Sequence, residues 1–185
     1  LWREGKVAKI ELPKNGLEGA VPSQLEALTC CRVVCLFGNR LSGRLDGSRL
    51  PASLTHLDLS YNKIDGPLPP ELARLVRLRT LNLQYNKLKG PIPDMFLKMD
   101  ELRDVAAQRN RLEGPLPPSL GACPRLRRLF LHENTNLSGP VPATFAKSRT
   151  LERLVLASTN VAPDSAPKAL LDRGCDVQIS PPKDD

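Results

Sequence analysis

Aromatic residues are scarce in this sequence, and long apolar runs are missing. Phe, Trp and Tyr together make up 4% of the 185 residues, so the core cannot be built around large rings. No stretch approaches the roughly 20 consecutive apolar residues that a membrane-spanning helix requires, and we therefore expect no membrane insertion. The sequence also has no glycine-rich phosphate loop and no Cys/His cluster with metal-ligand spacing, so we expect no cofactor.

What the sequence does contain is a repeat. The sequence LDLSYNKIDGPLP begins at Leu57, and its near copy LNLQYNKLKGPIP begins at Leu81. Six full units and a seventh partial unit, in which Thr159 replaces the asparagine, cover residues 7–161. A fixed period of this length is the signature of a solenoid. The repeated asparagines, spaced by 24, 23, 24, 24 and 24 residues, are Asn15, Asn39, Asn62, Asn86, Asn110 and Asn134.

This pattern resembles the plant-type leucine-rich repeat family, whose 24-residue consensus is LxxLxLxxNxLxGxIPxxLxxLxx. The resemblance implies an α/β repeat fold. We expect a right-handed solenoid with a concave parallel β-sheet and short helical or 3₁₀ segments on the convex side. Residues 1–6 are expected to form an N-terminal cap that includes Trp2, and residues 162–185 a C-terminal cap and tail.

The columns of the repeat have separate physical roles. We count them from the first leucine of each unit, so that Leu78 is in column one and Asn86 in column nine. Alternate residues of a strand face opposite sides, so Leu81 and Leu83 are expected to point into the core and Thr80 out of it. Asn86 is expected to satisfy backbone groups of adjacent turns, as one rung of a buried asparagine ladder.

The cysteines bear on the cellular compartment. Cys31 and Cys123 fall in inward columns and are interpreted as small buried hydrophobic residues. Unpaired cysteines favour a reducing compartment, so we predict a cytoplasmic location, with an extracellular location as the alternative. The alternative has support from Asn136, because Asn-Leu-Ser at 136–138 matches the N-glycosylation acceptor pattern. The cysteines are odd in number, which leaves at least one thiol free: Cys30, Cys31, Cys35, Cys123 and Cys175.

Function is expected in the outward columns of the sheet, since the inward columns only specify the fold. Both histidines and four of the seven aromatic residues fall in these columns. Exposed rings on a rigid sheet are typical of protein-binding hot spots, although tyrosine before the asparagine also packs on the neighbouring coil in this family. The candidate partner-binding residues form an aromatic patch and a second spot. The aromatic patch comprises Phe37, His56, Asp58, Tyr61, Asn82 and Tyr85, and the second spot comprises Arg128, Phe130 and His132.

Charge offers a further candidate surface on the last units. The formal net charge is +7, and an arginine group could form a basic area suited to an acidic partner. The alternative is a solvated ladder in which Asp104 pairs with Arg128 across one strand gap. Nucleic acid is not expected as a partner, because no nucleic-acid module is present and the aromatic residues do not interleave with the arginines. The group comprises Arg103, Arg109, Arg127, Arg128 and Arg153.

We therefore predict a non-catalytic protein–protein interaction module that binds a protein or peptide on its concave sheet. A reactive thiolate at Cys35, beside His56 and Asp58, is rejected because an open sheet offers no oxyanion hole or substrate pocket. The alternative from another class is the recognition arm of a larger enzyme, a kinase or a ubiquitin ligase, whose catalytic part is absent from this chain. The sequence does not predict an oligomeric state.

Overall fold

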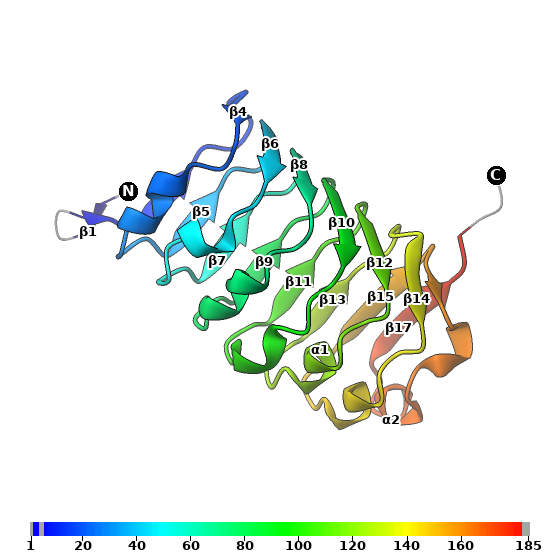
Figure 1. Ribbon diagram of the computed structural model, residues 1–185. Helices are drawn as coiled ribbons and strands as arrows, with labels where there is room; N and C mark the ends of the chain where they lie inside the picture. Colours follow the sequence, from blue (N-terminus) through cyan, green and yellow to red (C-terminus); the bar gives the residue numbers. More distant parts are fainter. Residues whose placement is uncertain (1, 4–5, 183–185) are drawn as a thin grey trace.

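Consecutive units of the sequence form consecutive coils that stack along one axis, from the N-terminal end to the C-terminal end (Figure 1). The computed structural model describes residues 2–3 and 6–182, with side chains from residue 6 onward. Each coil contributes one strand to a first sheet, one strand to a second sheet and a short helical turn. This arrangement confirms the fold class expected from the repeat.

The first sheet is parallel and lines the concave face. Strands of neighbouring units pair column by column, with His56 opposite Thr80 and Asp58 opposite Asn82. In the described residues the sheet has one strand more than the seven repeat units, because β17 of the C-terminal segment pairs with β15. Its strands are β3 (Lys9–Glu11), β5 (Val33–Cys35), β7 (His56–Asp58), β9 (Thr80–Asn82), β11 (Asp104–Ala106), β13 (Arg128–Phe130), β15 (Arg153–Ala157) and β17 (Asp176–Ser180).

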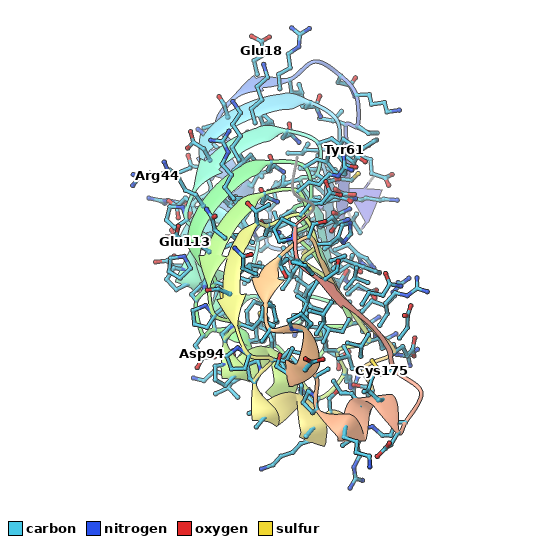
Figure 2. All side chains as sticks on the ribbon, turned by 90° about the vertical axis from the view of Figure 1, so that its right-hand side faces the viewer. Glu18, Arg44, Tyr61, Asp94, Glu113 and Cys175 are labelled. Carbon is cyan, nitrogen blue, oxygen red and sulfur yellow. The ribbon has the colours of Figure 1, made fainter. Side chains whose placement is uncertain are left out.

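The second sheet, also parallel, forms the flank of the solenoid, and Figure 2 shows it on the side away from Tyr61. A glycine with positive φ lies in or at the end of most of its strands, for example Gly90 at φ 81°, where the chain bends toward the convex side. Its strands are β4 (Glu18–Gly19), β6 (Arg40–Arg44), β8 (Lys63–Gly66), β10 (Lys87–Pro91), β12 (Arg111–Gly114), β14 (Asn136–Gly139) and β16 (Asn160–Val161).

The convex side carries short helical turns, most of them 3₁₀ turns. Proline immediately precedes or begins many of them, as Pro69 and Pro70 do at η3, because its fixed φ suits a helix start. No helix in the described part of the chain is long and apolar enough to cross a membrane. The turns are η1 (Ser23–Ala27), η2 (Gly47–Arg49), η3 (Pro70–Arg74), η4 (Phe96–Lys98), α1 (Pro118–Ala122), η5 (Ala143–Lys147), η6 (Pro163–Ser165) and α2 (Lys168–Leu171).

The core runs unbroken through the coils and consists mainly of leucines. Leu81 and Leu83 are 2% and 1% exposed, as the inward columns predict. Phe96 and Phe145 fill the space between the sheets and the convex turns and are also buried. Each coil therefore buries its apolar edge only against its neighbours, which is how solenoids are stabilised.

The asparagine ladder is present. Asn134 is fully buried; its Oδ1 accepts from the backbone N–H of Leu112 at 3.0 Å, and its Nδ2 donates to the carbonyls of Ala107 and Leu131 at 3.0 and 2.8 Å. Asn110 repeats this pattern one coil earlier. In the last unit the shorter Thr159 donates from Oγ1 to the Leu156 carbonyl at 2.6 Å instead.

The two ends of the solenoid differ in how they are covered. At the N-terminal end, β1 (Trp2–Arg3) pairs antiparallel with β2 (Lys6–Val7), while the Trp2 side chain and residues 1 and 4–5 of the expected cap lie outside the described residues. At the C-terminal end, Leu170 of α2 is fully buried, and β17 covers β15 along five residues. Residues 183–185 of the expected tail also lie outside the described part.

Candidate functional site

The rings of the aromatic patch project from the turn that follows each concave strand. Tyr61 and Tyr85 are in column eight, where the backbone is left-handed in every unit, and Phe37 precedes Gly38 in the same turn of unit two. This conformation was not foreseen from the sequence, because non-glycine residues seldom adopt it. The column-eight residues with positive φ are Lys14, Gly38, Tyr61, Tyr85, Arg109, Glu133 and Ser158.

The rings form a continuous ladder along the solenoid axis. Phe37 and Tyr61 meet edge to face with ring centroids 5.4 Å apart, and Tyr61 stacks on Tyr85 at 4.1 Å. The Lys14 ammonium lies 5.4 Å from the Phe37 centroid, and the Arg109 guanidinium lies 4.8 Å from the Tyr85 centroid. A hydrogen bond with Tyr85 raises the pKa of the Tyr61 phenol above its ordinary value. The rings thus support one another and present a rigid wall to solvent.

Polar side chains lie next to these rings, on the strands that precede Tyr61 and Tyr85. Asp58 Oδ1 accepts from the Ser60 backbone N–H at 2.9 Å and from the Ser60 hydroxyl at 2.6 Å. Its Oδ2 accepts from the Asn82 Nδ2 at 3.2 Å, across the gap between β7 and β9. Asp58 and Asn82 are therefore held in place before any partner arrives, with hydrogen-bonding capacity left over on both.

The Cys–His–Asp constellation considered above is not assembled. Cys35 lies opposite Asp58 in the sheet, as the spacing predicts. The Asp58 carboxylate, however, is engaged with Ser60 and Asn82, and the exposed His56 has its Nδ1 2.9 Å from the Thr55 hydroxyl. Among the described residues, no group of three or more His, Cys, Asp and Glu side chains is placed to hold a metal ion.

The second spot lies two units further along. Phe130 and His132 approach edge to face with centroids 6.5 Å apart. The exposed Arg128 donates from Nε to Asp104 at 2.6 Å, which confirms the ion pair predicted across one strand gap. Unit five separates this spot from the aromatic patch, so the predicted site residues form two groups on one face rather than one.

The arginine group is mostly neutralised by acids of neighbouring units. Ion pairs join Arg109 to Glu133 at 2.8 Å, Arg153 to Asp176 at 2.8 Å and Arg127 to Glu152 at 3.6 Å. These carboxylates come from the adjacent coil, 23 to 25 residues away in sequence. The geometry therefore favours the solvated ladder over a concentrated basic area.

A polar row in column seven was not identified from the sequence. Gln108 donates a hydrogen bond to Gln84, but Gln108 Oε1 is buried without a partner among the described residues. In the next unit, His132 Nδ1 is buried and unpartnered in the same way. Burial lowers the pKa of His132 below its ordinary value; Arg109 lowers it further, while Glu133 opposes the shift. The row places hydrogen-bonding groups between the aromatic patch and the second spot.

Acidification is expected to destabilise the fold through His132. Its pKa is lower in the folded chain than the unfolded value of about 6.5, so the unfolded state binds more protons near that pH and stability falls as the pH decreases. Melting temperatures measured between about pH 7.5 and about pH 5 should show this loss. His132→Gln, which copies the residue of the two preceding units, should flatten the dependence. If the melting temperature depends on pH equally in His132→Gln and in the unchanged chain, the loss of stability does not come from His132.

Comparison with protein families identifies the repeats. A family model described as Leucine Rich Repeat matches residues 53–75 and 77–99. Receptor-like protein 13 of Arabidopsis thaliana is 34% identical over 79 residues, which make up 42% of this chain and 7% of that protein. The chain thus corresponds to a small part of this relative.

Two solved structures with the same fold are those of plant receptors. The plant peptide hormone receptor RGFR1 in complex with RGF2 superposes with a TM-score of 0.79 and 27% identity, covering 83% of this chain and 24% of that one. A second match has a TM-score of 0.74 and 29% identity. It is the leucine-rich repeat ectodomain of the plant membrane receptor kinase GASSHO1/SCHENGEN3 from Arabidopsis thaliana, in complex with CASPARIAN STRIP INTEGRITY FACTOR 2. In that pair, the match covers 94% of this chain and 24% of the other.

The predicted cytoplasmic location is wrong, because the related structures include the ectodomain of a membrane receptor. The prediction rested on unpaired cysteines, and burial accounts for most of these. Cys31, Cys123 and Cys175 are all buried, and burial raises the pKa of the Cys123 thiol to about 12. Thiols shielded in this way are inert in any compartment, so their number carries no information about location.

Proposed function

Because this chain is a plant-type leucine-rich repeat protein, we propose that it is an extracellular module that binds a protein or peptide ligand on its concave sheet. The observation that carries the proposal is the ladder of Phe37, Tyr61 and Tyr85. Three rings in consecutive units are held against one another on the concave face, and Tyr61 is 44% exposed. Rings that are already ordered cost little conformational entropy when a partner binds.

The arrangement around the ladder favours an extended ligand. Along the sheet, the three rings are followed by polar side chains, namely Asp58, Asn82 and the glutamines of column seven. Phe130 lies beyond them, one strand after Ala106. Neighbouring strands lie about 4.8 Å apart, so this path runs for about 20 Å across the sheet. Related receptors were solved with RGF2 and with CASPARIAN STRIP INTEGRITY FACTOR 2, which supports a ligand of the same class here.

The comparisons do not support the alternative of a recognition arm for a larger kinase or ubiquitin ligase. The family match falls on repeats alone, at residues 53–75 and 77–99.

Site-specific photo-crosslinking tests the proposed face. A photoreactive amino acid is placed at Thr80, in the middle of the concave sheet, and in a matched variant at Lys87, on the flank of the same unit. With an extracellular protein and peptide fraction from plant tissue, we expect crosslinks from position 80 and none from position 87. Unlabelled chain should compete, and chain carrying Phe37→Ala and Tyr61→Ala should not. Equal crosslinking from both positions would refute binding on the concave sheet.

A further inference from the structure

An inserted residue displaces one asparagine from the buried ladder to the surface. In the other full units a single residue separates the ladder asparagine from the next inward leucine or isoleucine, as Lys87 does between Asn86 and Leu88. Unit six has two, Thr135 and Asn136. Asn134 keeps the ladder position with 0% exposure. Asn136 is instead the first residue of β14 and is exposed on the flank sheet.

Asn136 also begins the sequence Asn-Leu-Ser, the single Asn-x-Ser/Thr pattern in the chain. Among the described residues, its side-chain amide has no hydrogen-bond partner, whereas that of Asn134 donates to two buried carbonyls. An attached group at Asn136 would therefore break no internal bond. At Asn134 the same attachment would disrupt the ladder.

The surroundings of Asn136 can accommodate a large uncharged substituent. It lies opposite Glu113 in the flank sheet, and Figure 2 shows Glu113 on the side of the solenoid away from Tyr61. The neighbouring positions on β14 and β16 are uncharged, namely the half-buried Ser138 and the exposed Asn160, whereas earlier flank strands carry exposed cations such as Lys63 and Lys87. A group on Asn136 would leave the concave sheet open.

From these observations we infer that Asn136 carries an N-linked glycan when the chain enters the secretory pathway, an inference that rests on the extracellular location proposed above. The donor is an oligosaccharide joined to a lipid pyrophosphate. The Asn136 Nδ2 attacks C1 of the first sugar, the bond from C1 to the pyrophosphate oxygen breaks, and the lipid pyrophosphate leaves. The amide gives up one proton to a base of the transferase.

Mass spectrometry of the secreted chain tests the site. The full chain is expressed behind a secretion signal in a eukaryotic host, and the peptide containing residue 136 is analysed before and after enzymatic removal of N-glycans. We expect one glycan, converted on release to aspartate at position 136. Asn136→Gln and Ser138→Ala should abolish the glycan, and Ser138→Thr should keep it. Asn160→Gln, which removes an exposed asparagine outside any acceptor pattern, should leave the glycan in place.

A folded, secreted chain with unmodified Asn136 would overturn the inference. Cell-free synthesis of the chain behind the same secretion signal, in the presence of microsomes, provides a second readout that does not require secretion: the chain with Asn136 and Ser138 intact should gain one glycan, and Ser138→Ala none. If the chain does not gain this glycan in microsomes, the site is overturned even if the chain is poorly secreted. Photo-crosslinking from the concave sheet is independent of both measurements, so failure of the binding proposal and failure of the glycan site can be told apart.

Discussion

Replacing Asn134 with alanine is expected to lower the free energy of unfolding by about 2–4 kcal/mol. The variant leaves the backbone N–H of Leu112 and the carbonyls of Ala107 and Leu131 without their side-chain partner, at a position that is 0% exposed. Unpaired buried backbone groups keep their full desolvation cost, which makes this loss large for a single side chain.

The matched control is Asn136→Ala in unglycosylated protein, two residues away but exposed. It should change stability by no more than about 0.5 kcal/mol. Chemical denaturation gives both values, and hydrogen exchange at the Leu112 amide reports the local opening in Asn134→Ala. A loss below about 1 kcal/mol in Asn134→Ala would mean that the ladder bonds contribute little to the fold.

Once a partner is known, the double variant Phe37→Ala with Tyr61→Ala should bind it far more weakly. Interface energy concentrates in a few ordered aromatic residues, and we expect at least about a 30-fold loss of affinity per ring. The Phe37 ring meets Tyr61, and Tyr61 stacks on Tyr85, so the double variant removes most of the wall. Isothermal titration calorimetry with the purified partner measures the change.

Two controls separate lost contacts from lost structure. Tyr61→Phe keeps the stack and removes only a hydroxyl, so most of the affinity should remain. Lys63→Ala alters the exposed flank of the same coil and should have no effect on binding. Circular dichroism must show that the double variant is folded. Full affinity in a folded double variant would move the binding surface to the Phe130 and His132 spot.

The fold could be predicted from the sequence because each column of the repeat has one local role. An inward leucine such as Leu81, or a ladder residue such as Asn110, meets equivalent residues in the coils before and after it. Register alone therefore predicts burial and strand pairing. The same reasoning predicted the ion pair between Asp104 and Arg128, because column and register place these two residues side by side.

The site was predictable only in part, because its details depend on side-chain conformations. Column spacing places Phe37, Tyr61 and Tyr85 in consecutive coils, but it does not show that the rings stack on each other. Nor does it show that Asp58 is already bonded to Ser60 and Asn82. The pairing of β17 with β15 was also missed, because the C-terminal segment breaks the period that supports every other register.

The left-handed backbone of column eight bears on how such a surface can diversify. The chain holds tyrosine, arginine, glutamate and serine there at nearly the same φ, between 53° and 57°. Residues that are not branched at Cβ carry a similar conformational cost of about 1–2 kcal/mol in that geometry, whereas β-branched residues are more strained and proline cannot adopt it. One such residue can therefore replace another at nearly constant backbone energy. Point mutations in column eight can change the chemistry of the proposed binding surface and leave the solenoid beneath it unaltered.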